Sequence, residues 1–268
     1  MQPIGTHAFF LIESPLMTLG KVYLIGAGPG DIELLTLKAV RVLGLADVVL
    51  LDDLANPAIL QFARPEAEIV RVGKRGGCQS TSQDFILSEM LERARSGQCV
   101  ARVKGGDPMI FGRAGEEMQA LQAAGIAVEI INGISAGMAG PASIGMPLTH
   151  RDHAHGVTFV TGHTLADDEP DWRVLAQSGM TLVIYMGMRK LADICEQLLS
   201  AGLAADTPAA IIQHATLPAQ RQLLSQLGAL PIAAEAAGLG SPAIVVIGAV
   251  AALSALPQSM ETLQKEEA

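Results

Sequence analysis

Short apolar runs alternate with amphipathic segments through the first half of the chain. Most runs stop at glycine or a charged residue and are followed by apolar residues at helical spacing. This pattern predicts strands at 21–27, 47–51, 68–72, 98–103 and 126–131. Strands that alternate with helices are typical of a parallel sheet with right-handed crossovers. We therefore expect an α/β fold whose N-terminal sheet is mostly parallel.

Three helices are expected between these strands. The first follows Asp31, which can cap it, and carries an apolar stripe that ends before Gly44. The second begins at a variant of the capping box, formed by Thr81 and Asp84, and ends near Gly97. The third precedes the last strand of this half.

The second half is predicted to form a mixed sheet, because fewer helices separate its last strands. Its strands are expected at 157–161, 181–186, 209–213, 223–225 and 243–250. The alternation pauses at MPLTHRDHAHG, where we place a domain boundary. The expected organisation is a loose extension at 1–18, an N-terminal α/β domain at 19–150, a C-terminal α/β domain at 151–256 and a tail at 257–268.

The composition excludes several classes of protein. The 268 residues, half of them hydrophobic, can form the core of one large α/β domain or two smaller ones. A net charge of -9 argues against a surface that attracts nucleic acid or anionic lipid, so an anionic ligand would need a local basic pocket. No apolar run reaches the roughly 18 residues that span a bilayer, and the N-terminal stretch lacks a basic n-region. We expect a cytoplasmic protein without nucleic-acid or membrane partners, for which Met17 is an alternative start.

No metal site is expected. The three cysteines lie far apart and show no CxxC or nearby Cys/His spacing. His153, His155 and His163 include no i, i+4 helical pair and have no cysteine close by.

The distinctive loops follow predicted strands, where ligands bind in parallel sheets. GAGPGD resembles a dinucleotide loop, but Asp31 stands where GxGxxG requires glycine, which argues against a nicotinamide dinucleotide. In KGGDPMIFG, Gly105 and Gly106 let the backbone approach a ligand, and Asp107 can accept hydrogen bonds from an amine or hydroxyl. VGKR and PLTHRD occupy further loops. Together these motifs favour a ligand site over ordinary turns.

These segments resemble the uroporphyrinogen III C-methyltransferases of the tetrapyrrole methylase superfamily. The similarity runs from about Gly20 to Leu253 and includes LIGAGPGD, VGKRGG, KGGDPMIFGRAGEE, NGISAG, GMPLTHRD and SPAIVVIG. It implies two α/β domains with the active site in a cleft between them, a homodimer, and S-adenosylmethionine as the cofactor. The implied reaction is methylation of uroporphyrinogen III at C2 and C7, which gives precorrin-2 by way of precorrin-1.

The resemblance also implies which residues bind the cofactor. Most of them are small and expose backbone groups, while Ile110 and Met186 add apolar contact. The implied positions are Pro29, Gly105, Gly106, Asp107, Ile110, Ser135, Ala136, Met186, Ala215, Pro242 and Ala243. Taken alone, Met186 would more often belong to a strand core, and Ala215 stands where glycine is common in the family.

Charged residues of the substrate site are implied in the same way. They are Asp52, Lys74, Arg113, Glu116 and Arg151. The substrate is a polycarboxylate, so the basic residues would bind it, with Arg113 as a clamp rather than a base. Asp52 and Glu116 are candidate proton acceptors. For Glu116 and Glu117 the alternative is a solvated first helical turn, which the helix dipole favours.

Two positions depart from the family pattern, and three alternative functions stay open. Leu51 and Asp53 stand where the family has Tyr and Arg, which puts a substrate contact of that Arg in doubt. A later methyltransferase of corrin synthesis would share GAGPGD and GGDP but diverge at VGKRGG and PLTHRD. A diphthine-forming or ribosomal RNA relative would need a basic docking face, and a non-catalytic S-adenosylmethionine-binding protein would bind without turnover. Sirohaem, cobalamin and haem d1 all stay open as end products.

Overall fold

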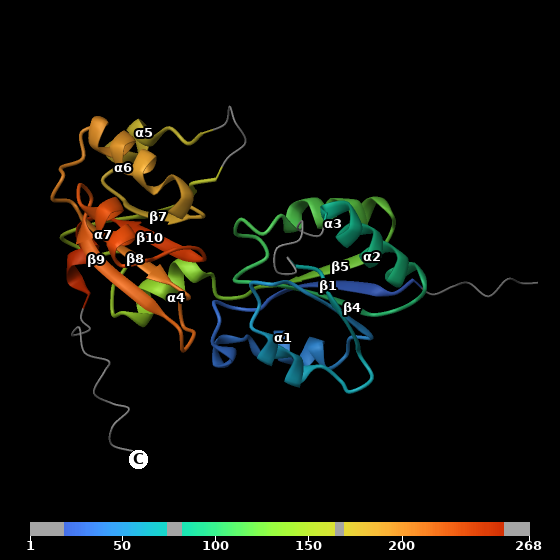
Figure 1. Cartoon of the computed structure of the whole chain (residues 1–268). Coiled ribbons are helices and arrows are strands. Elements are labelled where there is room, and N and C mark those ends of the chain that lie inside the picture. Colours follow the sequence, from blue (N-terminus) through green and yellow to red (C-terminus); the bar gives the residue numbers. More distant parts are fainter. Residues whose placement is uncertain (1–18, 74–81, 164–168, 255–268) are drawn as a thin grey trace, which may run out of the picture.

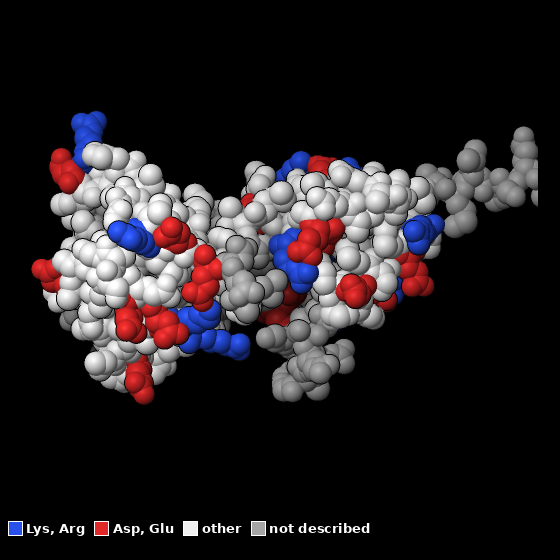
Figure 2. All heavy atoms as spheres, turned by 90° about the horizontal axis from the view of Figure 1, so that it is seen from above, with Lys and Arg blue, Asp and Glu red and all other residues white. Residues whose placement is uncertain are grey.

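The structure is a computed structural model that describes residues 19–73, 82–163 and 169–254. These residues form two α/β domains that lie side by side (Figure 1, Figure 2), each built on a five-stranded sheet. The N-terminal sheet is entirely parallel, whereas the C-terminal sheet mixes parallel and antiparallel pairs. The predicted fold class is therefore confirmed.

The N-terminal sheet has the strand order β3-β2-β4-β1-β5. Its strands are β1 (Lys21–Gly26), β2 (Val48–Leu51), β3 (Glu68–Arg71), β4 (Val100–Lys104) and β5 (Ala127–Ile131). Because all five strands are parallel, their carboxyl ends meet at one edge of the sheet, and the loops that follow β1, β4 and β5 are neighbours there.

Helices cover both faces of this sheet (Figure 1). One face packs against α1 (Leu37–Leu43) and the 3₁₀ helix η2 (Pro57–Phe62), and the other packs against α2 (Gln83–Arg95) and α3 (Ala114–Ala123). Alternate residues of β4 contribute to the two cores, because side chains along a strand point to opposite faces.

Two predicted helix starts were wrong. Asp31 caps only a short 3₁₀ helix, η1 (Ile32–Leu34), and α1 begins after Thr36, whose side chain accepts a hydrogen bond from Ala39 N at 3.1 Å. The N-cap of α2 is Ser82, whose Oγ accepts from Phe85 N at 3.2 Å, while Thr81 lies outside the described residues.

The C-terminal sheet has the strand order β6-β7-β10-β8-β9. Its strands are β6 (Val157–Thr161), β7 (Thr181–Tyr185), β8 (Pro208–Gln213), β9 (Arg221–Gln226) and β10 (Ala243–Ile247). Since β10 runs antiparallel to β7 and β8, its first residues lie where those two strands end. The expected strand at 243–250 stops earlier, because Gly248 adopts a φ of 143° and leads into the 3₁₀ helix η4 (Ala249–Leu253).

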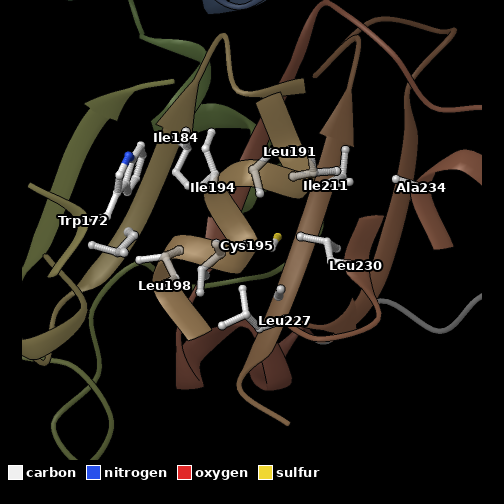
Figure 3. Packing of buried hydrophobic residues seen from close by; sticks show 14 of the residues in the cluster. Trp172, Ile184, Leu191, Ile194, Cys195, Leu198, Ile211, Leu227, Leu230 and Ala234 are labelled. Carbon is white, nitrogen blue, oxygen red and sulfur yellow. The ribbon is translucent and has the colours of Figure 1, made fainter. Parts of the chain in front are cut away.

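Helices also cover both faces of the C-terminal sheet. One core lies between the sheet and the helices α5 (Trp172–Gln177), α6 (Leu191–Ser200) and α7 (Leu230–Ala236). The 3₁₀ helix η3 (Met188–Lys190) directly precedes α6. Figure 3 shows Cys195 among the leucine and isoleucine side chains of this core. On the other face, η4 and α4 (Ala136–Ser143) contribute to a second core.

The position of α4 bears on the domain boundary. Although α4 precedes residue 150 in sequence, it packs on β7 and β10 of the C-terminal sheet. We propose that the structural boundary lies in the segment between β5 and α4, which is also where the loop after β5 leaves the parallel sheet.

Candidate functional site

The loops after β1 and β4 are held together by a reciprocal pair of backbone hydrogen bonds. Gly28 N donates to Gly106 O at 3.2 Å, and Gly106 N donates to Gly28 O at 2.7 Å. Gly106 has a φ of 67°, a conformation that glycine adopts without steric cost. The pair therefore brings GAGPGD, which includes Pro29, beside GGDP.

The loop after β5 adjoins the same place. A Cβ atom added to Gly106 would lie 3.7 Å from Ser135 Cα and 3.8 Å from Ala136 N. Four of the residues implied as cofactor contacts, Gly105, Gly106, Ser135 and Ala136, are thus close neighbours. Ile110 follows in the same loop, where its N–H donates to Asp107 O at 3.3 Å.

The Asp107 carboxylate ties these loops to one another. Its Oδ1 accepts from Met109 N at 2.7 Å, and its Oδ2 accepts from Asn132 Nδ2 and Gly133 N, each at 3.1 Å. A carboxylate offers about four acceptor positions, so most of those of Asp107 are already used. The buried Asp107 side chain therefore fixes the shape of the site. The sequence alone did not indicate this structural role.

Tyr185, which the sequence analysis missed, links the C-terminal sheet to these loops. It ends β7; its hydroxyl lies 2.7 Å from Ser135 Oγ and accepts from Gly137 N at 2.9 Å. Burial raises the pKa of Tyr185, so the phenol stays neutral. The Phe111 ring from the β4 loop lies 4.9 Å from the Tyr185 ring, between centroids. The position of Tyr185, at a strand end and directly before the implied cofactor contact Met186, could have indicated that it belongs to the site.

Backbone strain gathers in the loops that follow β4, β7 and β8. Non-glycine residues with left-handed φ lie in these loops alone among the described residues: Phe111, Arg113, Met186, His214 and Thr216. Such conformations cost on the order of 1–3 kcal/mol each and cluster at functional sites. Met186 is 47% exposed, so it does not belong to the strand core.

The three remaining residues implied as cofactor contacts lie together where β8 ends and β10 begins. Ala215 follows His214, whose N–H donates to Pro242 O at 3.2 Å, and Ala243 pairs with Gln213 in the antiparallel ladder. The Ser241–Pro242 peptide bond is cis. The buried Gln213 side chain has an Oε1 atom without a hydrogen-bond partner among the described residues.

Two of the implied charged residues contact each other. Arg113 donates from Nε and Nη2 to Glu116 Oε1 and Oε2, at 2.9 Å and 2.6 Å, and both side chains are more than half exposed. This contact raises the pKa of Arg113 and lowers the pKa of Glu116. The solvated first turn, offered as the alternative for Glu116, describes its exposure correctly.

The other implied charged residues are placed separately. Asp52 follows β2 and is half-buried, and its N–H donates to Val103 O at 3.1 Å. Arg151 is exposed in the turn bounded by His150 and Ala154 and forms no ion pair with the described residues. Lys74 lies outside the described residues.

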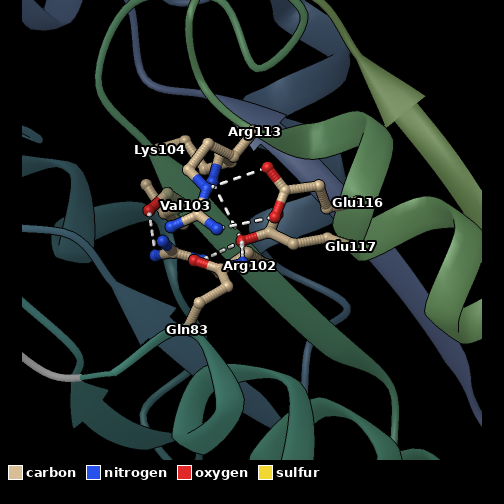
Figure 4. A network of polar contacts seen from close by, with 7 residues as sticks. All are labelled: Gln83, Arg102, Val103, Lys104, Arg113, Glu116 and Glu117. Atoms are coloured by element: carbon tan, nitrogen blue, oxygen red, sulfur yellow. Dashed lines mark hydrogen bonds and ion pairs between the residues drawn. The ribbon is translucent and has the colours of Figure 1, made fainter. Parts of the chain in front are cut away.

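Glu117, by contrast, is fully buried, so the solvated alternative was wrong for this residue. Its Oε1 accepts from Lys104 Nζ at 3.0 Å, from Gln83 Nε2 at 3.1 Å and from Arg102 Nε at 3.4 Å (Figure 4). Its Oε2 has no partner among the described residues. Burial is the main cause that lowers the pKa of Lys104, and the positive charge of Arg102 lowers it further. The two cations need this one carboxylate, because a buried charge without a partner is costly.

The described residues contain no group of three or more His, Cys, Asp or Glu placed to hold a metal ion. Nor does any helix in the described ranges combine the length and apolar character that crossing a membrane requires. A cavity of about 180 Å³ is lined in part by Ala154, Thr181 and Gly248, at the start of β7 and the end of β10, and so lies away from the glycine-rich loops.

The two α/β domains bring glycine-rich and strained loops together at their junction, beyond the carboxyl ends of parallel strands, which is where α/β proteins bind their ligands. The chain matches the family model of tetrapyrrole (corrin/porphyrin) methylases over residues 21–231. It belongs to this family, as the sequence resemblance implied.

Individual relatives agree with this assignment. The chain is 58% identical over 231 residues to uroporphyrinogen-III C-methyltransferase of Pseudomonas aeruginosa, an alignment that covers 86% of this chain and 94% of the relative. The structure of uroporphyrin-III C-methyl transferase from Thermus thermophilus, complexed with S-adenyl homocysteine, matches with a TM-score of 0.75 at 39% identity, covering 87% of this chain and 100% of that one. Cobalt precorrin-4 methyltransferase matches with a TM-score of 0.77 at 28% identity, covering 86% and 95%.

Proposed function

We propose that this protein transfers methyl groups from S-adenosylmethionine to C2 and C7 of uroporphyrinogen III, giving precorrin-2 by way of precorrin-1. The observation that carries the proposal is 58% identity to a uroporphyrinogen-III C-methyltransferase over 94% of that relative's length. The fold alone does not choose between this reaction and a later corrin methylation, because the TM-scores of the two structural relatives are nearly equal. Sequence identity favours the first.

The residues at the domain junction fit S-adenosylmethionine. Gly106 leaves the space beside Ser135 and Ala136 free of a Cβ, so backbone groups can contact a flat polar ligand. The exposed side chain of Met186 supplies an apolar surface nearby in the C-terminal domain. We propose that the eleven positions implied by the resemblance hold this cofactor, with Asp107 acting through the loops that it ties together.

When bound, S-adenosylmethionine supplies a methyl group on a sulfonium, which is already a good electrophile. The protein therefore has to hold the reacting carbon of the substrate in line with that methyl group, and such alignment accounts for much of the rate enhancement in bimolecular reactions. The rigid contact between Tyr185 and Ser135 serves this purpose, since it fixes the end of β7 against the loop after β5.

Loss of a proton from the methylated ring requires an acceptor. Glu116 is poorly suited, because its contact with Arg113 lowers its pKa and makes it a weaker base. Arg113 cannot accept the proton, because its guanidinium is already protonated at neutral pH and the contact with Glu116 raises its pKa further. Asp52 is half-buried at the carboxyl end of β2, next to the end of β4. We therefore assign the proton acceptor to Asp52.

Arg113 can bind a substrate carboxylate without releasing Glu116. The contact with Glu116 uses Nε and Nη2, which leaves Nη1 and the second Nη2 proton available along the other edge of the guanidinium. We propose that this edge and Arg151 bind carboxylates of the substrate, together with Lys74.

A macromolecular substrate is less well supported. A diphthine-forming or ribosomal RNA relative would dock on a basic face, but acidic and basic side chains are interspersed on the face shown in Figure 2. We also propose, from the family resemblance, that the protein acts in the cytoplasm as a homodimer.

Mass analysis of the product tests the proposed reaction. Incubation of the full-length protein with uroporphyrinogen III and S-adenosylmethionine should add two methyl groups, and Asp52→Asn should slow turnover while S-adenosylhomocysteine still binds. Binding of S-adenosylhomocysteine without any methylation would instead favour the non-catalytic alternative. Methylation restricted to a later precorrin would favour the corrin-pathway alternative.

A further inference from the structure

A chain of hydrogen bonds connects the two domains between the loops after β1 and β8. Asp31 N donates to Thr216 Oγ1 at 3.0 Å, although the two residues are 185 positions apart in sequence. Thr216 N donates in turn to Gln220 Oε1 at 2.6 Å, and the same oxygen accepts from Ser143 Oγ at 3.0 Å. Gln220 therefore joins the β8 loop to the end of α4 through one acceptor atom.

Thr216 is held in a conformation that its side chain disfavours. Its φ is 65°, and a β-branched residue with left-handed φ is a genuine outlier. A strained residue persists only where its surroundings fix it. Here the fixing contacts are the bond from Asp31 and the bond to Gln220, both of which use polar atoms of Thr216 itself.

The two loops are also packed too closely for either to shift alone. A Cβ at Gly30 would lie 2.6 Å from Leu217 Cγ and 3.1 Å from Ala215 O. On the other side, Asn56 Nδ2 donates to Gly30 O at 2.7 Å, so the β1 loop is fixed from the N-terminal domain as well.

We propose that Thr216 and Gln220 are positioning residues that set the affinity for S-adenosylmethionine. Pro29 directly precedes Gly30, and Ala215 directly precedes Thr216. The hydrogen bonds through Thr216 and Gln220 therefore determine how far apart these two cofactor positions lie, one in each domain. This inference rests on the proposed function, because it assumes that Pro29 and Ala215 contact that cofactor.

Two pairs of variants isolate the polar atoms. Thr216→Val keeps the branched shape and removes the acceptor for Asp31 N, whereas Thr216→Ser keeps the hydroxyl. Gln220→Met removes the shared acceptor at similar length, whereas Gln220→Glu retains an oxygen there. The matched control is Gln222→Met on β9, since Gln222 is exposed and makes no side-chain hydrogen bond with the described residues.

The readouts are the Kd of S-adenosylhomocysteine by calorimetry, the thermal midpoint, and KM and kcat with S-adenosylmethionine. Thr216→Val and Gln220→Met should each raise Kd and KM about five- to tenfold, the usual effect of one lost hydrogen bond, and change kcat less than twofold. Thr216→Ser, Gln220→Glu and Gln222→Met should stay within about twofold of wild type in all three constants.

Unchanged Kd in folded Thr216→Val and Gln220→Met would overturn the inference, and so would an equal loss of affinity in the Gln222→Met control. If Gln220→Met does not fold, the isosteric Thr216→Val variant decides alone. Wild-type protein that fails to bind S-adenosylhomocysteine would contradict the proposed function itself, before any variant is compared.

Discussion

The Lys104 ammonium and the Glu117 carboxylate form a buried ion pair at 3.0 Å, between the last residue of β4 and the first turns of α3. Arg102, two residues earlier on the same face of β4, lies against the same carboxylate. One anion thus serves two buried cations directly before Gly105, where the loop of the candidate site begins. The pair anchors the base of that loop.

Removal of the Glu117 carboxylate should destabilise the protein strongly. Glu117→Leu leaves Lys104 and Arg102 buried without a counter-charge, and breaking a buried pair in this way costs about 3–5 kcal/mol. The free energy of unfolding, measured by urea denaturation, should fall by that amount. Glu116→Leu is the matched control, because this neighbour is exposed and water screens its ion pair with Arg113. Similar losses in both variants would show that the buried network contributes little.

Addition of one methyl group at Gly106 should weaken cofactor binding more than it weakens the fold. Gly106→Ala forces a side chain into a left-handed conformation, at a cost of about 1 kcal/mol, and places its Cβ in the space beside Ser135. Gly125→Ala carries the same backbone cost in open space, since Gly125 has a φ of 73° and nothing within 4 Å of an added Cβ. S-adenosylhomocysteine titration should show about a tenfold loss of affinity for the first variant only. Equal affinity in both variants would place the ligand elsewhere.

The fold could be predicted from the sequence largely because the spacing of buried apolar residues differs between strands and helices. Every expected strand is present, with ends displaced by a few residues, and the largest change is at 243–250, where the left-handed Gly248 follows the end of β10. Contacts such as that between Asp31 and Thr216 could not be predicted, because no local pattern links residues 185 positions apart. The cofactor positions came from the family resemblance rather than from any physical argument on spacing.

The burial of Glu117 could have been inferred. Ala114, Glu117 and Leu121 follow one another at helical spacing, and all three are buried, while Glu116 points away from that face. Along β4, Arg102 and Lys104 share a face with Val100, because strand side chains alternate. Two cations on a buried strand face require an anion opposite, and Glu117 is the acidic residue on the buried face of α3.

The thiol of Cys195 should resist modification until high pH. Burial in the core of the C-terminal domain raises its pKa to about 11, from a usual value of 9.0. At about pH 8 a Cys78→Ser/Cys99→Ser variant should react with a maleimide far more slowly when folded than when unfolded, because the thiolate is the reactive form. Rapid labelling of the native protein would contradict this burial.

The same shift predicts the sign of a stability change. Between pH 9.0 and about 11 the unfolded chain releases the Cys195 proton while the folded chain keeps it. The contribution of the Cys195 thiol to the free energy of unfolding is therefore fully present below pH 9.0 and is lost as the pH rises toward about 11. Cys195→Val should remove that part of the pH dependence in denaturation curves. An identical slope in the variant would assign the loss to other groups.

Arg113 and Arg151 should affect the two ligands differently. Arginine binds a carboxylate through paired planar donors, a geometry that lysine does not reproduce although it keeps the charge. If each Arg→Lys variant loses a charge-assisted hydrogen bond of about 1.5–3 kcal/mol, kcat/KM for uroporphyrinogen III should fall roughly tenfold to a hundredfold. Affinity for S-adenosylhomocysteine should barely change. Arg95→Lys, at the exposed end of α2, serves as the control.

A structural role is the competing explanation, in which both arginines would form ion pairs between the domains. The contacts argue against it, because Arg113 pairs with Glu116 three residues along in its own domain and Arg151 forms no ion pair with the described residues. We therefore expect the thermal midpoint of both variants to match that of Arg95→Lys. Normal turnover in both would exclude the carboxylate clamp. A parallel decrease in midpoint, cofactor affinity and turnover would instead assign the two arginines to the framework of the fold.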